Sequence, residues 1–127
     1  MSGFLYVALG GAIGASARHG LGHVLAGQST GGFPVATFLA NVGGGFLMGV
    51  LAAFLALKID GGESLRLFLG VGILGGFTTF SAFSLESILL FERKAYGLMT
   101  LYVGGSVILS LCALAFGLML GRVMFAS

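Results

Sequence analysis

Four long apolar stretches, separated by short polar segments, make up nearly all of this 127-residue chain. They cover residues 3–25, 34–57, 64–91 and 96–123. The hydrocarbon core of a bilayer is about 30 Å thick, and a helix of about 20 residues crosses it. The pattern therefore predicts an all-α membrane protein with four transmembrane helices, organised as one transmembrane domain over residues 1–127.

The composition supports a membrane protein and excludes a soluble globule. Hydrophobic residues make up 57% of the chain and charged residues only 8%, whereas soluble domains carry roughly 25% charged residues. Six basic side chains are scattered along the sequence and the net charge is +2. Without a basic stripe or patch, a nucleic-acid partner is not expected.

The basic residues are balanced between the two ends of the predicted helices. Three belong to one side of the membrane and three to the other: Lys58, Arg66 and Arg122 against Arg18, Arg93 and Lys94. The positive-inside rule, which orients helices by an excess of Lys and Arg, then gives no preferred orientation. A chain of this kind is expected to insert both ways and to pair with an inverted copy, as an antiparallel, dual-topology homodimer.

The chain contains 24 glycines, and small residues let membrane helices approach closely. Each predicted helix contains two glycines four positions apart, which favours tight packing and oligomerisation. The pairs are Gly10 and Gly14, Gly45 and Gly49, Gly72 and Gly76, and Gly117 and Gly121.

The third stretch has a poor helix centre, where Gly75 and Gly76 are followed by Phe77 and the β-branched pair Thr78 and Thr79. This pattern predicts a helix broken mid-span. Backbone groups freed inside a membrane are tolerated where they are buried in protein or line a cavity, and they can hold ions. A mild kink, in which the threonine hydroxyls bond the preceding turn, is the alternative.

Polar groups recur inside the apolar stretches at helical spacing. They are Thr37 and Asn41 in the second stretch, Thr78, Ser81 and Ser84 in the third, and Tyr102, Ser106 and Ser110 in the fourth. Phe77, Phe80 and Phe83 also recur every three residues. Hydroxyl and amide donors, together with positive aromatic ring edges, would line a path for a small anion that has shed its water. Alternatively, the aromatic rings only pack against lipid or the protein core. The hydroxyls would then bond to their own backbone or to other helices.

Several of these segments together resemble one known family. Residues 75–86 read Gly-Gly-Phe-Thr-Thr-Phe-Ser-Ala-Phe-Ser-Leu-Glu and are similar to the signature of the Fluc/CrcB fluoride channels. Residues 41–44 (Asn-Val-Gly-Gly), residues 14–18 (Gly-Ala-Ser-Ala-Arg) and the spacing of Tyr102, Ser106 and Ser110 match the same family. The resemblance covers the whole chain in order.

The resemblance implies a passive, fluoride-selective channel in a prokaryotic cell membrane, which lowers the toxicity of cytoplasmic fluoride and is not an enzyme. It implies an antiparallel homodimer with two pores and a structural sodium ion that is not transported. The backbone carbonyls of Gly75 and Thr78 in each chain would bind the sodium at the dimer interface. The implied fluoride pathway consists of Asn41, Phe80 and Phe83, with donors from Thr37, Ser81, Ser84, Tyr102, Ser106 and Ser110, and with Arg18 near a water-filled vestibule.

The main alternative function is a proton-coupled exporter of cationic compounds, similar to the small multidrug transporters. That mechanism needs a carboxylate embedded in the membrane. Glu86 is the one acidic candidate inside the four stretches, near the end of the third, where it could be hydrated. Its role is left open by the sequence.

Two further alternatives are weaker. An accessory packing subunit would account for the glycines. It would not account for the polar groups at helical spacing together with the predicted break in the third helix. His19 and His23 have the i, i+4 spacing of metal ligands on a helix, but no third ligand lies near them in the sequence.

Overall fold

The computed structural model of the chain describes residues 2–25, 32–58, 62–78 and 80–126. Regular structure within these ranges is entirely helical, which confirms the predicted all-α fold for them. The elements are α1 (Ser2–Val24), α2 (Val35–Lys58), α3 (Glu63–Leu65), the π-helix η2 (Arg66–Leu74), α4 (Gly75–Phe77), α5 (Phe80–Glu92) and α6 (Tyr96–Phe125). Residues 26–31 and 59–61 of the predicted polar segments lie outside the described residues, as does Thr79.

Three of the helical stretches are long and apolar enough to cross a membrane: α2, the stretch Glu63–Glu92 and α6. The helices begin and end within two residues of the predicted ranges. Helix α1 has 23 residues, which is sufficient length for a bilayer. It is less apolar than the other three because Arg18, His19 and His23 lie in its last two turns.

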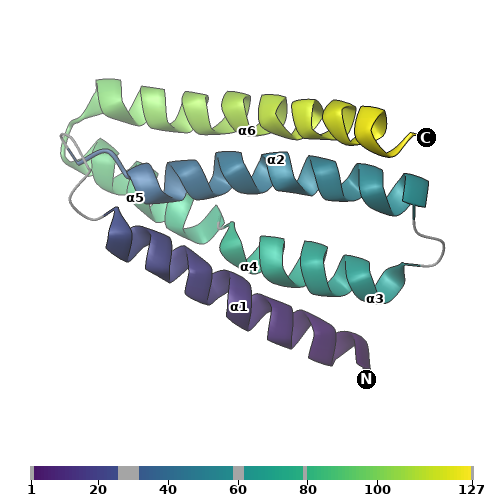
Figure 1. The fold of residues 1–127 in the computed structure, drawn as a ribbon. Helices are drawn as coiled ribbons and strands as arrows, with labels where there is room; N and C mark the ends of the chain where they lie inside the picture. The colour runs from purple at the N-terminus through teal and green to yellow at the C-terminus, as the bar shows by residue number, and fades with distance from the viewer. Residues whose placement is uncertain (1, 26–31, 59–61, 79, 127) are drawn as a thin grey trace.

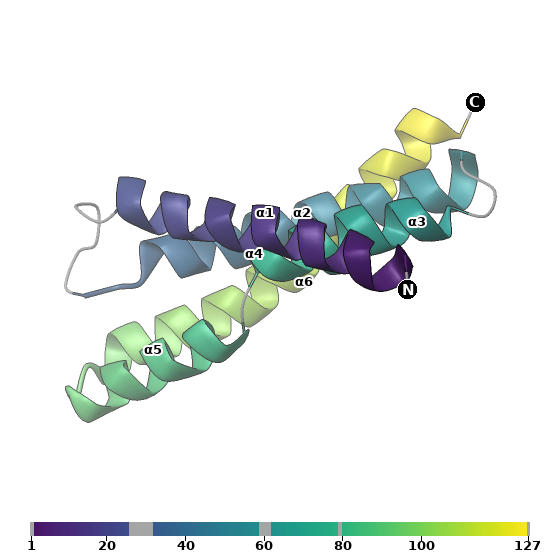
Figure 2. The ribbon, with the colours of Figure 1, turned by 90° about the horizontal axis from the view of Figure 1, so that it is seen from below.

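The helices form two packed pairs, as Figure 1 shows. Helix α2 lies along α6, and α1 lies along the run from η2 to α4. Beyond α4 the third stretch leaves α1, and α5 packs against α6 instead (Figure 2). Both chain termini lie at the same end of the bundle (Figure 1).

Glycines allow the backbones of α2 and α6 to touch. A Cβ atom on Gly49 would lie 2.2 Å from the carbonyl oxygen of Leu114, and one on Gly117 would lie 2.2 Å from that of Phe46. Real Cβ atoms do not approach backbone this closely, so neither position accepts a side chain without movement. The glycine pairs predicted in the second and fourth helices therefore face each other.

The second helix pair uses the same device. A Cβ atom on Gly14 of α1 would lie 2.0 Å from the carbonyl oxygen of Ile73, and one on Gly72 of η2 would lie 2.9 Å from the Cα of Gly10. Close backbone approach replaces the hydrophobic driving force that helices lack inside a bilayer. Both helix pairs thus depend on glycine in both partners.

The third stretch changes its backbone conformation after α4. Helix α4 ends at Phe77, and Thr78 has an extended backbone with φ −84° and ψ 151°. The hydroxyl of Thr78 donates a 3.0 Å hydrogen bond to the carbonyl of Leu74, and α5 begins at Phe80. The methyl group of Thr78 lies only 2.3 Å from where a Cβ of Gly44 would be, so this glycine of α2 makes room for it.

The outer surface of the bundle is strongly apolar. Phe4 and Val123 are each 78% exposed and Leu111 is 66% exposed. Exposed apolar side chains in such numbers indicate a surface covered by lipid or by another protein chain.

Replacing Gly117 by Ala is predicted to destabilise the fold by about 1–3 kcal/mol, the usual cost of overpacking, because the new methyl group would meet the carbonyl of Phe46. Gly104→Ala in the same helix is the matched control, since no described residue beyond its own stretch of helix comes within 4 Å of a Cβ there. Thermal unfolding in detergent measures the difference. Equal midpoints for the two variants would show that the glycine contact does not hold α2 and α6 together.

Candidate functional site: a cavity at the junction of α4 and α5

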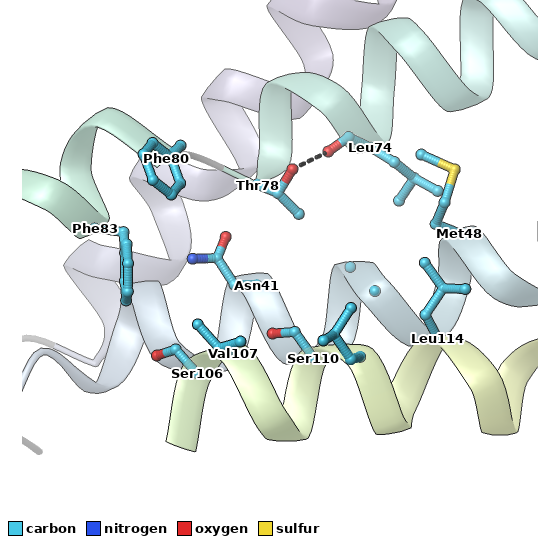
Figure 3. A pocket seen from close by; sticks show the side chains of 13 residues that line it. Asn41, Met48, Leu74, Thr78, Phe80, Phe83, Ser106, Val107, Ser110 and Leu114 are labelled. Atoms are coloured by element: carbon cyan, nitrogen blue, oxygen red, sulfur yellow. Dashed lines mark hydrogen bonds between the residues drawn. The ribbon is translucent and has the colours of Figure 1, made fainter. Parts of the chain in front are cut away.

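A cavity of about 420 Å³ lies between α2, α6 and the junction of α4 with α5. Its two ends differ in chemistry, as Figure 3 shows. The polar and aromatic end is lined by Asn41, Thr78, Phe80, Phe83, Ser106 and Ser110, and the apolar end by Met48, Leu74 and Leu114. Five residues of the predicted fluoride pathway therefore line one end of a single cavity: Asn41, Phe80, Phe83, Ser106 and Ser110.

Two buried hydroxyl groups in this cavity have no hydrogen-bond partner among the residues that the structure describes. Ser106 is only 4% exposed. Within the described part of the chain, neither its Oγ nor that of Ser110 finds a donor or acceptor. Burying a hydroxyl without a partner costs about 1–3 kcal/mol in proteins. The two buried serines therefore lower the stability of the fold. Their hydroxyl groups lie beside the side chain of Asn41 and can donate hydrogen bonds (Figure 3).

A row of aromatic rings begins in the cavity wall beside these hydroxyls and continues beyond it. The ring centroids of Phe80 and Phe83 are 5.6 Å apart, and those of Phe83 and Tyr102 are 5.2 Å apart. Phe80 is 79% exposed, whereas Tyr102 is completely buried. The row therefore runs from the molecular surface into the bundle.

Behind the ring of Tyr102, a chain of polar side chains links four helices. The Nη2 group of Arg18 in α1 donates to the hydroxyl of Thr37 in α2, and the Thr37 hydroxyl lies near the hydroxyl of Tyr102 in α6. The hydroxyl of Tyr102 donates a 2.9 Å hydrogen bond to Oε1 of Glu86 in α5. Thr37 and Tyr102 are both fully buried, so the chain satisfies polar groups that would otherwise be costly.

The sequence left the role of Glu86 open, and the structure places this carboxylate against Tyr102. Glu86 follows Phe83 by three residues, which puts both on one face of a helix. Phe83 also contacts the ring of Tyr102. This spacing is the signal that could have connected Glu86 to the polar stripe of the fourth helix.

The remaining predicted residues lie elsewhere. Thr37, Tyr102 and Arg18 belong to the polar chain just described rather than to the cavity lining. Ser81 is exposed, and the hydroxyl of Ser84 donates to the carbonyl of Phe80 at 2.9 Å, which is the backbone bonding that the sequence left open as an alternative.

The two predicted sodium ligands lie in different surroundings. Thr78 lines the cavity, whereas Gly75 lines a second cavity of about 710 Å³ between α2 and η2. His19 and His23 are exposed on α1. No group of three or more His, Cys, Asp or Glu side chains suited to a metal occurs in the described ranges.

A family model described as "CrcB-like protein, Camphor Resistance (CrcB)" matches residues 5–118. The chain belongs to the CrcB family. This confirms the resemblance that the sequence motifs indicated. As a CrcB protein with three long apolar helical stretches, the chain is a multi-pass membrane protein.

Close relatives in the CrcB family carry the name "Fluoride-specific ion channel FluC". The relative from Paracoccus denitrificans is 52% identical over 123 residues, which are 97% of each chain. Those from Hyphomonas neptunium and Phenylobacterium zucineum are 50% and 53% identical over 127 residues, covering 99% of this chain and all of each relative. These names describe ion channels, which are a class of transport protein and not of enzyme.

Proposed function

We propose that this chain forms a fluoride-selective channel that lets fluoride leave the cytoplasm passively. Two findings support the proposal. Relatives about half identical to it along nearly their whole length are named as fluoride-specific channels. The chain also brings five predicted pathway residues to one end of a single cavity.

Within that cavity lining, the hydroxyls of Ser106 and Ser110, which have no partner among the described residues, are the observation that carries the proposal. Fluoride is small and strongly hydrated, so a selective path must replace its water with protein donors. Buried hydroxyls without partners are donors that need not break an existing hydrogen bond before they bind an anion. Their burial lowers the stability of the fold, and binding of the passing ion is the function that accounts for it.

The cavity offers partial charges rather than fixed ones. None of its described lining residues is a lysine or arginine. The edges of the Phe80 and Phe83 rings carry partial positive charge and add to the hydroxyl donors. Conduction requires binding weak enough to allow release, and partial charges meet that requirement better than an ammonium group would.

We propose that the channel is an antiparallel homodimer of two inverted copies. The balanced Lys and Arg residues support insertion in both orientations. The cavity wall also reaches the surface of the single chain, where Phe80 is 79% and Val107 is 49% exposed. A second copy against this wall would complete the enclosure.

In this dimer the third helix would be broken at Thr78 and would hold a structural sodium ion. The extended backbone of Thr78 supports the break, because it turns the Thr78 carbonyl away from the helical direction. Neutral carbonyl oxygens of Gly75 and Thr78 suit a hard cation of low charge. When bound, the ion would tie together the two inverted chains at carbonyls that a bilayer cannot solvate.

Removing the two hydroxyls is predicted to separate function from stability. Liposomes with purified wild-type protein should release fluoride and retain chloride, as ion-selective electrodes can record. The double variant Ser106→Ala, Ser110→Ala should lower fluoride release about tenfold or more, because two hydrogen bonds to the ion are lost. A factor of ten in rate corresponds to about 1.4 kcal/mol. The thermal stability of the variant should equal or exceed that of the wild type, because no hydrogen bond within the described chain is lost.

Ser64→Ala, an exposed serine of α3 outside the cavity, is the control. Fluoride release at the wild-type rate by the double variant would contradict the proposed role of the two hydroxyls.

Forcing one orientation is predicted to abolish assembly. Adding two or three lysines to one end of the helices should make all chains insert the same way. Fluoride efflux should fall, and it should recover when a copy with lysines at the opposite end is co-expressed. Full efflux from a uniformly oriented population would rule out the antiparallel dimer.

Removing sodium is predicted to weaken the dimer without changing the transported ion. In choline salts, the dimer should dissociate at a lower temperature than in sodium salts, because the carbonyls at the break lose their ligand. Analytical ultracentrifugation in detergent across a sodium series measures this. Dissociation that does not depend on sodium would eliminate the structural ion.

A further inference from the structure

Helix α5 repeats one hydrogen-bonding arrangement behind the two phenylalanines of the cavity. The hydroxyl of Ser84 donates to the carbonyl of Phe80 at 2.9 Å, and the hydroxyl of Ser87 donates to the carbonyl of Phe83 at 2.7 Å. Each serine follows its phenylalanine by four residues. Ser87 did not stand out in the sequence, and it does not line the cavity.

The Ser87 hydrogen bond acts on the backbone that carries the Phe83 ring. In an α-helix the carbonyl of residue i already accepts the N–H of residue i+4. A serine hydroxyl that donates to the same oxygen tilts that carbonyl and bends the helix slightly. Ser87 is 6% exposed, so water is not available to take over its hydroxyl.

A bend at this point of α5 would reach the cavity, because the Phe83 ring has a buried neighbour. Its centroid lies 5.2 Å from that of Tyr102, which is fully buried and hydrogen-bonded to Glu86. On the other side the Phe80 ring lies 5.6 Å away. A change in the tilt of the first turns of α5 therefore moves the Phe83 ring edge relative to the cavity.

We propose that Ser87 is a positioning residue, which fixes the ring edge of Phe83 through its hydrogen bond to the Phe83 carbonyl. The inference rests on the proposed fluoride pathway, in which that ring edge faces the ion. Groups that bind a small ion need placement within about 0.5 Å. Ser87 supplies this precision from outside the cavity lining, through the Phe83 carbonyl.

A graded series at position 87 tests the hydrogen bond. Ser87→Ala removes the donor and should lower fluoride release in liposomes about fivefold, the rate equivalent of one typical intramolecular hydrogen bond. Ser87→Cys keeps the size of the side chain and a weak donor, so its rate should lie between the two. Size-exclusion chromatography establishes whether each variant is folded. If the alanine variant does not fold, the cysteine variant alone provides the comparison with wild type. Equal rates across the folded variants would overturn the proposal.

A double-mutant cycle separates positioning from a general structural effect. Phe83→Met keeps measurable release because the thioether is flexible and polarisable. If Ser87 acts through the ring, removing its hydroxyl in the Phe83→Met background should change release by less than twofold. Additive losses are expected of residues that act independently, and they would overturn the proposal.

The same liposomes distinguish a failure of this inference from a failure of the proposed function. Phe83→Ile removes the ring, and Phe4→Ile makes the same change at an exposed position on α1. Loss of release in Phe83→Ile alone, with wild-type release in Ser87→Ala, would reject positioning by Ser87 while retaining the pathway. Wild-type release in both Phe83→Ile and Ser87→Ala would reject the ring-edge pathway itself, and with it the inference.

Discussion

Close contact between helix backbones at glycine determines how this molecule is built. Inside a bilayer, apolar surface gains little by leaving lipid, so helices associate through tight packing and hydrogen bonds. Gly49 and Gly117 bring α2 against α6, and Gly14 brings α1 against η2. These two rigid pairs fix the distance between α2, α6 and the third stretch, and the cavity is the space left among them.

Inside the bilayer, a buried polar group without a hydrogen-bond partner lowers the stability of the fold. The chain from Arg18 through Thr37 and Tyr102 to Glu86 pairs most of the polar groups at one end of the bundle. The hydroxyls of Ser84 and Ser87 donate hydrogen bonds to backbone carbonyls. Within the described chain, the hydroxyls of Ser106 and Ser110 and the Nε of Arg18 have no such partner. The two hydroxyls lie beside Asn41 in the cavity, where they can donate to an anion.

The helices and much of the site could be predicted because both follow from local sequence. Uninterrupted apolar runs gave helix bounds within two residues of those observed, and i, i+4 spacing placed Ser106 and Ser110 on one stripe. Other features depend on contacts between distant residues. The π-helical winding of η2 and the hydrogen bond between Tyr102 and Glu86 are of this kind. Whether a serine hydroxyl faces a cavity or its own backbone, as at Ser84, also depends on which partner lies within reach.

In the proposed channel, a dehydrated fluoride ion binds at the polar end of the cavity. Asn41 is the single asparagine in the chain, so labelling asparagine with 15N at its side-chain amide marks one position. Solid-state NMR of fluoride-loaded proteoliposomes can then measure the 19F–15N dipolar coupling. We expect a coupling that places fluoride within about 3.2 Å of the amide nitrogen, the outer range of hydrogen-bond distances, and its loss in the Ser106→Ala, Ser110→Ala variant. Absence of any coupling in wild-type liposomes that release fluoride normally would contradict the account.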